Sequence, residues 1–222
     1  MIDDEYHVMA YTADLSMLRL DLYFDFLSPY TYLASTRLDG IARRTGVQVR
    51  YTPLHILDLM KLVGNRPTTF ESANKRRYAG QDMLRWAAKY GVAVNSHPRA
   101  RKFDFSLLRQ AALVANDLGR PGDFTQGVLK GLWGLGLDLE DEEVLVGLLD
   151  GIGFDGAALL EAARDPQYAE VLKANTEEAA SRGAFGSPTF FVGDEMFFGN
   201  DRLDFVEDAL LRALGATPEG RP

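Results

Sequence analysis

The sequence predicts an α/β fold in which a strand–helix–strand unit and a strand–strand–helix unit share one sheet. Residues near both ends alternate apolar and polar side chains as strands do, whereas residues 56–182 carry only helical patterns. Neither end unit can bury both faces of a sheet alone, so the two must combine. The expected domains are therefore residues 18–60 joined with 183–215, a helical insertion at 61–182, and an N-terminal extension at 1–17 with no assigned function.

The first strand is expected at residues 18–26, where Leu or Phe occupies every even position. Ser28 and Pro29 then end it, because proline suits the first turn of a helix and serine can cap that helix. Apolar residues follow at helical spacing as far as Gly46, a helix-ending residue. Ser28 thus lies where a strand meets a helix N-terminus, a place that favours an anion. The alternative is that Ser28 is an ordinary N-cap.

The second strand is expected at residues 47–52, VQVRYT, which again alternates and is ended by Pro53. Two strands joined through one helix must run parallel, with a right-handed crossover. The pattern therefore predicts a βαβ unit at the start of the fold.

The middle of the chain divides into helices that are delimited by caps, prolines and glycines. The expected helices are 56–63, a segment from the Thr68-x-x-Glu71 capping box to Tyr90, 105–118, 121–133, 141–150, 155–164 and 166–182.

Strand character returns at residues 189–192, and Gly193-Asp194 predicts a two-residue hairpin turn into a strand at 195–198. A proline directly before a core strand needs special geometry, and a cis Ser187–Pro188 bond would supply it. The final helix is expected to start at Gly199-Asn200-Asp201. Its predicted buried face consists of Leu203, Val206, Leu210 and Leu214.

Composition narrows the possible functions. The chain has 222 residues, a net charge of -8 and no cysteine. Lack of cysteine excludes disulfides, thiolate metal sites and any thiol chemistry carried by the protein itself. The acidic balance argues against nucleic-acid binding, and the three dispersed histidines give no metal-ligand spacing. No apolar run has membrane-span length and no export signal is evident, so a cytoplasmic protein without a membrane partner is expected.

Two segments make a family resemblance specific. They are DFLSPYTYLA at 25–34 and AFGSPTFFVGDEMFFGNDRLDF at 184–205. The order of elements is that of the thioredoxin fold, and both segments resemble the 2-hydroxychromene-2-carboxylate isomerases. These enzymes are relatives of kappa-class glutathione transferases and of the DsbA-like disulfide oxidoreductases. The resemblance extends over residues 18–214 and is loose through the helical insertion.

The resemblance implies a glutathione-dependent enzyme. Where the oxidoreductases carry Cys-x-x-Cys, this chain has Ser28-Pro29-Tyr30-Thr31, so it cannot cycle disulfides. In the isomerases and transferases the matching serine donates a hydrogen bond to the glutathione sulfur. A free thiol has a pKa of about 8.5, and a hydroxyl donor at a helix N-terminus would lower it. A nucleophilic serine would need a base, and no Gly-x-Ser-x-Gly elbow is present.

Other glutathione contacts follow from the same resemblance. Ser187 matches the position whose backbone pairs with the tripeptide like an added strand. Gly199, Asn200 and Asp201 match the start of the last helix, which receives the γ-glutamyl end. The alternative is that Asn200 or Asp201 simply caps that helix.

Substrate contacts are also implied. Lys61 and Asn65 match a loop that closes over the site, with Lys61 a candidate for the substrate carboxylate; a solvated lysine is the alternative. Four aromatic residues could form the wall of an aromatic pocket or belong to the core: Trp86, Phe103, Phe105 and Trp133.

The function that the resemblance implies is isomerisation of 2-hydroxychromene-2-carboxylate-type compounds in bacterial aromatic hydrocarbon catabolism. Reversible thiolate addition would make glutathione a cofactor. The alternatives are a kappa-class-like glutathione transferase and a non-catalytic module that binds thiol peptides. Dimers are common in the family, so a homodimer is expected.

Overall fold

The computed structural model describes residues 18–67, 71–95 and 97–215. The predicted extension at 1–17 and Thr68 of the predicted capping box lie outside these ranges. One four-stranded sheet has the order β2-β1-β3-β4. Its strands are β1 (Arg19–Phe24), β2 (Gln48–Pro53), β3 (Thr189–Val192) and β4 (Glu195–Phe198). β1 runs parallel to β2 and antiparallel to β3, and β3 pairs antiparallel with β4. The predicted strand order along the chain, parallel first pair and hairpin are confirmed.

The α-helices are α1 (Pro29–Thr45), α2 (Ile56–Leu62), α3 (Ala73–Tyr90), α4 (Ser106–Asp117), α5 (Pro121–Leu129), α6 (Glu142–Gly151), α7 (Gly156–Ala163), α8 (Pro166–Ser181) and α9 (Leu203–Ala213). Three tighter or wider turns complete the described elements: η3 (Ala100–Lys102) and η5 (Asn200–Arg202) are 3₁₀-helices, and η4 (Lys130–Leu135) is a π-helical segment.

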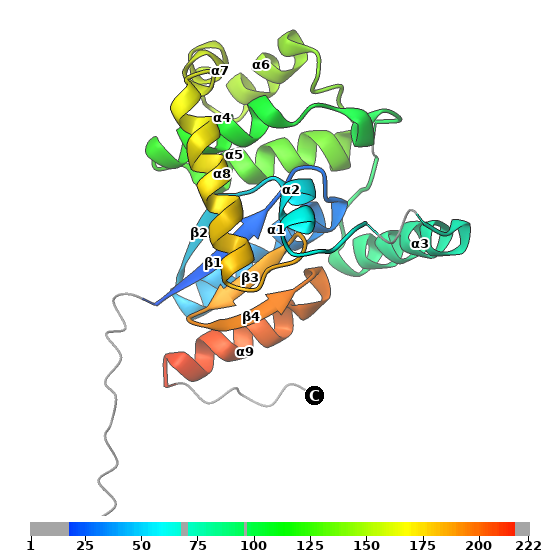
Figure 1. The fold of residues 1–222 in the computed structure, drawn as a ribbon, viewed down its shortest axis with the longest axis vertical. Coiled ribbons are helices and arrows are strands. Elements are labelled where there is room, and N and C mark those ends of the chain that lie inside the picture. The colour runs from blue at the N-terminus through cyan, green and yellow to red at the C-terminus, as the bar shows by residue number, and fades with distance from the viewer. Residues whose placement is uncertain (1–17, 68–70, 96, 216–222) are drawn as a thin grey trace, which may run out of the picture.

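Helices cover both faces of the sheet. Leu20, Leu22 and Phe24 of β1 pack into the main core with α1 and α9, whereas Tyr23 packs with α2 and α8 on the other face. Figure 1 shows α8 running from the helical block across the sheet, and α9 below β4 at the lower end of the view. β1 is an inner strand, and helices cover both faces of the sheet. Its polar residue Asp21 is therefore buried as well.

Several predicted boundaries differ from the structure. The first strand ends at Phe24 rather than at residue 26, because Asp25 starts a turn in which the Ser28 amide donates to the Asp25 carbonyl at 3.2 Å. The helix predicted to follow Thr68 begins at Ala73, with Ser72 at the N-cap position. The helix predicted over 121–133 is α-helical only to Leu129 and then widens into η4.

The helical block lies between the two halves of the sheet in the chain. Helices α4 to α7 form one mass at an end of the sheet, and α3 projects away from it (Figure 1). The predicted domain limits at residues 60–61 and 182–183 stay a prediction, since α2 crosses the first of them. Within the described ranges, no helix combines the length and apolarity required to cross a membrane.

Candidate active site

Ser28 lies at the junction that the sequence predicted, but its hydroxyl does not cap α1. It occupies the N-cap position in extended conformation without a side-chain capping bond. Instead, Ser28 Oγ donates to the Ser187 carbonyl at 2.9 Å. The residue is only 8% exposed. The hydroxyl therefore faces the segment before β3, where a ligand that pairs with the Ser187 backbone would also lie.

Ser187 joins the two halves of the fold through its side chain as well. Its peptide bond to Pro188 is cis, as the sequence suggested. Its hydroxyl accepts from the Asp25 amide at 2.9 Å and bonds Thr31 Oγ1 at 3.0 Å. The sequence prediction used only the backbone of Ser187, because nothing in a local pattern indicates which hydroxyl a distant amide will meet.

A buried ion pair lies behind the Ser28 turn. Arg109 of α4 donates to both oxygens of Asp25, from Nε at 3.1 Å and from Nη2 at 3.0 Å. The side chains are 4% and 0% exposed. Sequence analysis missed this pair, since Asp25 fitted the polar register of a strand and Arg109 lies 84 residues away in a helix. A charged residue three positions before the serine was the only available signal.

The start of the last helix has the geometry of a close backbone approach. Gly199 has φ of 99°, and a Cβ there would lie 2.6 Å from Asp201 Oδ1, so a larger residue would be strained. Asn200 is buried, and its carbonyl accepts from Tyr90 Oη at 2.8 Å. Asn200 Nδ2 is buried without a hydrogen-bond partner in the described part of the chain. Neither Asn200 nor Asp201 makes a side-chain cap; Asp201 pairs with Arg202 at 2.6 Å.

A pocket of about 110 Å³ opens beside this segment, between α1, α3 and α9. Asn200, Asp201, Tyr90 and Trp86 line it, together with Arg37 from the third turn of α1. An α-helix rises about 1.5 Å per residue, so Arg37 lies roughly 13 Å along α1 from Ser28. Asn200 and Asp201 lie on the wall of this pocket, whereas Ser28 does not line it, so the Ser28 hydroxyl lies outside it.

The two predicted substrate contacts lie at the end of α2. Lys61 is exposed in the last turn of α2, as a solvated lysine would be. Asn65 Nδ2 donates to the Phe185 carbonyl at 2.8 Å. This bond ties the loop after α2 to the segment that carries Ser187.

Three of the four candidate aromatic residues belong to the core. Phe103, Phe105 and Trp133 are at most 7% exposed, and Trp133 Nε1 donates to the Phe26 carbonyl at 2.9 Å. Trp86 instead packs against Tyr90 at 5.4 Å and lines the pocket at α9. Within the ranges that the structure describes, no group of three or more His, Cys, Asp or Glu side chains could hold a metal ion.

Comparison with known proteins gives one family. A family model described as the DSBA-like thioredoxin domain matches residues 19–211. The chain is 39% identical to a 2-hydroxychromene-2-carboxylate isomerase of Sphingobium xenophagum over 194 residues, which cover 86% of this chain and 97% of the relative. A solved 2-hydroxychromene-2-carboxylate isomerase superposes with a TM-score of 0.80 at 29% identity, covering 88% of this chain and 95% of that one. A glutathione S-transferase kappa 1 of Caenorhabditis elegans is 25% identical over 86% of this chain and 90% of its own length.

These similarities confirm the predicted thioredoxin-like fold with its helical insertion. The chain therefore belongs to the 2-hydroxychromene-2-carboxylate isomerase family, within the DSBA-like thioredoxin domains and related to the kappa-class glutathione transferases.

Proposed function

We propose that the protein is a glutathione-dependent isomerase of aromatic carboxylates of the 2-hydroxychromene-2-carboxylate type. The observation that carries the proposal is the direction of the Ser28 hydroxyl. It points across the helix N-terminus to the Ser187 carbonyl rather than onto its own helix, in a chain that contains no thiol. A protein with this arrangement can stabilise the sulfur of a ligand but has none of its own.

The residues present fit glutathione. Ser28 offers a hydroxyl donor beside the positive end of α1, which suits a thiolate. Ser187 offers backbone groups to a peptide. Asn200 Nδ2 is a buried donor that lacks a partner among the described residues, and a carboxylate at the γ-glutamyl end would satisfy it. Asp201, with Gly199 giving it room, suits the ammonium group of the same end.

When bound, glutathione would supply a thiolate that adds reversibly to the conjugated system of the substrate, so that a double bond becomes single, rotates and is restored as the thiol is returned. The chain's own part is electrostatic and geometric. Ser28 can turn its proton from the Ser187 carbonyl to the sulfur, and a backbone amide of the tripeptide can take its place on that carbonyl. Lys61, exposed in the last turn of α2, and Asn65, in the loop that follows, would orient the substrate carboxylate.

Calorimetry and product analysis test this function. Wild-type protein should bind glutathione and convert the substrate with the glutathione concentration unchanged. Ser28→Ala should lower kcat/KM by roughly 10²- to 10³-fold, the usual effect of deleting a donor to a developing anion. Ser35→Ala is the matched control, because Ser35 is a buried serine of α1 whose hydroxyl bonds the Tyr32 carbonyl. Absence of glutathione binding to the wild type would refute the proposal.

A glutathione transferase is the second candidate, favoured by the similarity to the kappa-class enzyme. The same site would then join glutathione to an electrophile and keep the adduct. A thioether product with matching loss of glutathione identifies the transferase. Binding of glutathione with no turnover of any electrophile identifies a non-catalytic thiol-peptide module.

We also propose that the protein is a homodimer. β4 is an edge strand of the sheet, and the exposed rings of Phe185 and Phe198 lie 4.6 Å apart beside it. Exposed edges and apolar patches of this kind favour association. Light scattering should give twice the chain mass of 24.6 kDa, and a mass equal to one chain would exclude the dimer.

A further inference from the structure

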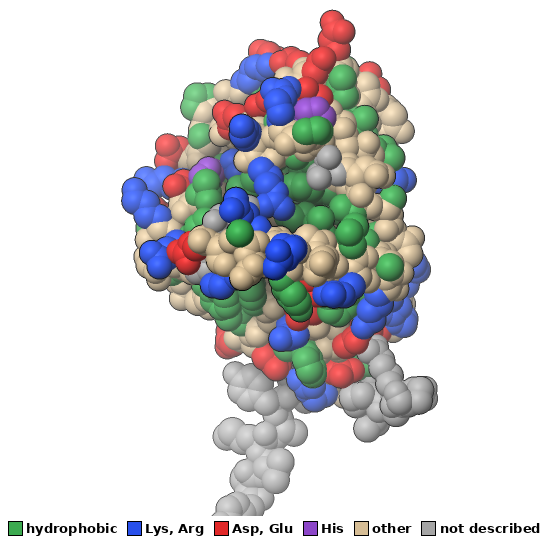
Figure 2. Space-filling model, turned by 90° about the vertical axis from the view of Figure 1, so that its right-hand side faces the viewer, with side chains coloured by type: hydrophobic (Ala, Val, Ile, Leu, Met, Phe, Trp, Pro, Cys, Tyr) green, Lys and Arg blue, Asp and Glu red, His purple; other side chains and the backbone are tan. Residues whose placement is uncertain are grey.

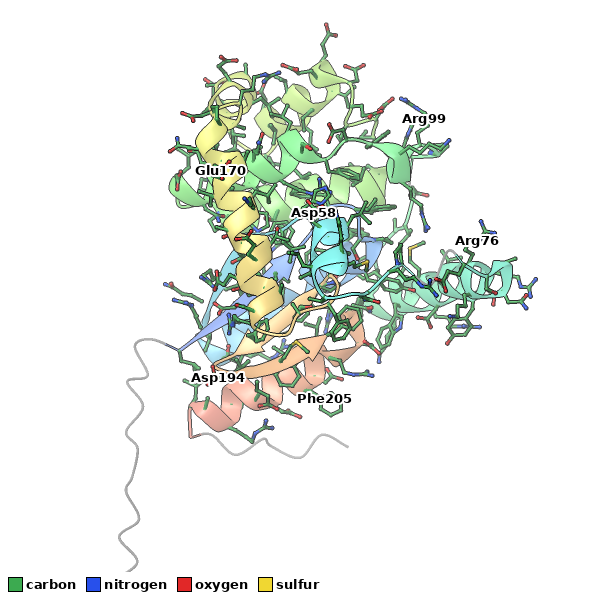
Figure 3. The ribbon with its side chains drawn as sticks, in the orientation of Figure 1. Asp58, Arg76, Arg99, Glu170, Asp194 and Phe205 are labelled. Carbon is green, nitrogen blue, oxygen red and sulfur yellow. The ribbon has the colours of Figure 1, made fainter. Side chains whose placement is uncertain are left out.

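The carboxylate of Asp25 is fully engaged, and its contacts come from three parts of the fold. One oxygen accepts from the Leu27 amide at 2.9 Å and the other from the Ile56 amide at 2.8 Å. Arg109 donates to both oxygens. Leu27 is the residue directly before Ser28, Ile56 is the first residue of α2, and Arg109 belongs to α4. Asp58, labelled in Figure 3, marks the short helix α2 on which one of these contacts falls.

A buried carboxylate with four such contacts has little freedom to move. Removing two charges from water is costly, and the cost is recovered only when geometry and hydrogen bonding are complete. Here Asp25 has no exposed surface and Arg109 is 4% exposed on its side chain. The pair therefore fixes the turn before Ser28 relative to α2 and to the helical insertion.

We propose that Asp25 and Arg109 are positioning residues that hold the Ser28 hydroxyl in register with the ligand sulfur. This inference rests on the proposed function of Ser28. Asp25 bonds the turn and the first residue of α2, Arg109 holds Asp25, and the pair acts through these contacts. A displacement of about 1 Å at a reacting group can lower a rate by roughly 100-fold. Loss of the pair should therefore displace the Ser28 hydroxyl and lower the rate.

The charges of the pair could instead act directly on the pKa of the bound thiol. This direct charge effect and the positioning effect predict different signs for the pKa shifts of the variants. If only charge mattered, an unpaired Arg109 would favour the thiolate and an unpaired Asp25 would oppose it. Asp25→Asn and Arg109→Met would then shift the pKa of the bound glutathione thiol in opposite directions. Positioning predicts that both raise this pKa, because both loosen the turn that carries the hydroxyl.

Four variants separate these effects: Asp25→Asn, Arg109→Met, the double variant of these two, and Arg109→Lys. Asp25→Asn has a single acceptor oxygen and cannot serve the Leu27 and Ile56 amides together. The double variant Asp25→Asn/Arg109→Met removes both charges at once, and Arg109→Lys keeps the cation but loses the two-pronged contact. Arg109→Lys is the mildest change, so it still tests positioning if the other variants do not fold.

Asp21→Asn is the matched control. Asp21 is also a buried carboxylate of β1 and accepts from Arg182 at 2.8 Å, but its partners do not include the Ser28 turn. It should reproduce any general loss of stability without changing the site.

The experiment measures thiol ionisation by ultraviolet absorbance of bound glutathione, together with kcat and KM. Asp25→Asn and the double variant should raise the pKa of the bound thiol and lower kcat roughly 10- to 100-fold, with Arg109→Lys intermediate. Asp21→Asn should leave both values at those of the wild type. Opposite pKa shifts of the bound thiol in Asp25→Asn and Arg109→Met, or equal effects of Asp21→Asn and Asp25→Asn, would overturn positioning. Failure of the wild type to bind glutathione would instead refute the function on which this inference rests.

Discussion

Ser28 is held in place by a carbonyl across the fold rather than by the helix that it precedes. The Ser28 hydroxyl donates to the Ser187 carbonyl. The Ser187 hydroxyl in turn bonds Thr31 Oγ1 and accepts from the Asp25 amide. Each of these bonds links the end of β1 or the start of α1 to the segment before β3. At the scale of single residues, the site is therefore a small network in which the position of one hydroxyl depends on two chain segments about 160 residues apart.

Asp21 gives a prediction at the same scale. Burial raises the pKa of Asp21, but hydrogen bonds from Arg182 and Arg19, with the charge of Arg50, outweigh it, so the pKa lies below its ordinary value. The unfolded chain then binds more protons than the folded one in acid. The stabilisation by Asp21 is complete above the unfolded pKa of about 3.9 and is lost as pH falls through the folded value.

We expect Asp21→Asn to lower the free energy of unfolding near neutral pH by about 2 kcal/mol, the scale of a hydrogen bond to a charged group. The difference from the wild type should shrink below about pH 4. Urea unfolding at a series of pH values measures it, and a difference independent of pH would contradict the assignment.

At the scale of elements, local pattern was enough to predict most helices and all four strands. Gly193 and Asp194 predicted the hairpin, and Val192 indeed pairs with Glu195. The Asp25–Arg109 pair could not be predicted, because burial of a charge depends on which distant helix covers it. The true start of α3 was also missed: the helix begins at Ala73, with Ser72 at the N-cap position.

A testable prediction at this scale concerns the loop that follows α2. Asn65 Nδ2 bonds the Phe185 carbonyl and so holds this loop against the segment before β3. A partly exposed hydrogen bond contributes about 1 kcal/mol, which corresponds to roughly a fivefold change in an equilibrium. We expect Asn65→Ala to raise KM for the aromatic substrate about fivefold while kcat changes less.

Steady-state kinetics with Asn175→Ala as control measure this effect. Asn175 Nδ2 also bonds a backbone carbonyl, that of Pro53, but from α8. An equal rise in KM for both variants would show that losing any such hydrogen bond raises KM, and would contradict a specific role for the loop after α2.

At the scale of the whole molecule, charge is distributed unevenly. Residues 61–109 hold eleven Lys and Arg against three Asp and Glu, although the chain as a whole has a net charge of -8. Figure 2 looks at the side from which α3 projects and shows Lys and Arg side chains gathered there; Arg76 extends from α3 in Figure 3. A basic region on an acidic protein can steer anionic ligands, and salt screens such steering.

We expect kcat/KM for the carboxylate substrate to fall several-fold between low salt and about 0.5 M salt. Arg76→Glu should lower kcat/KM about threefold at low salt with kcat unchanged. Lys173→Glu, at an exposed position of α8, makes the same change in net charge away from this region and should have little effect. Equal effects of the two variants would contradict steering.

The measurement that tests the central claim most directly is a pH titration of bound glutathione, followed by thiolate absorbance, in the wild type and in Ser28→Ala. The account predicts that the wild type holds the pKa of the bound thiol well below about 8.5 and that Ser28→Ala returns it toward that value. The same pKa in both proteins would contradict the role of the Ser28 hydroxyl.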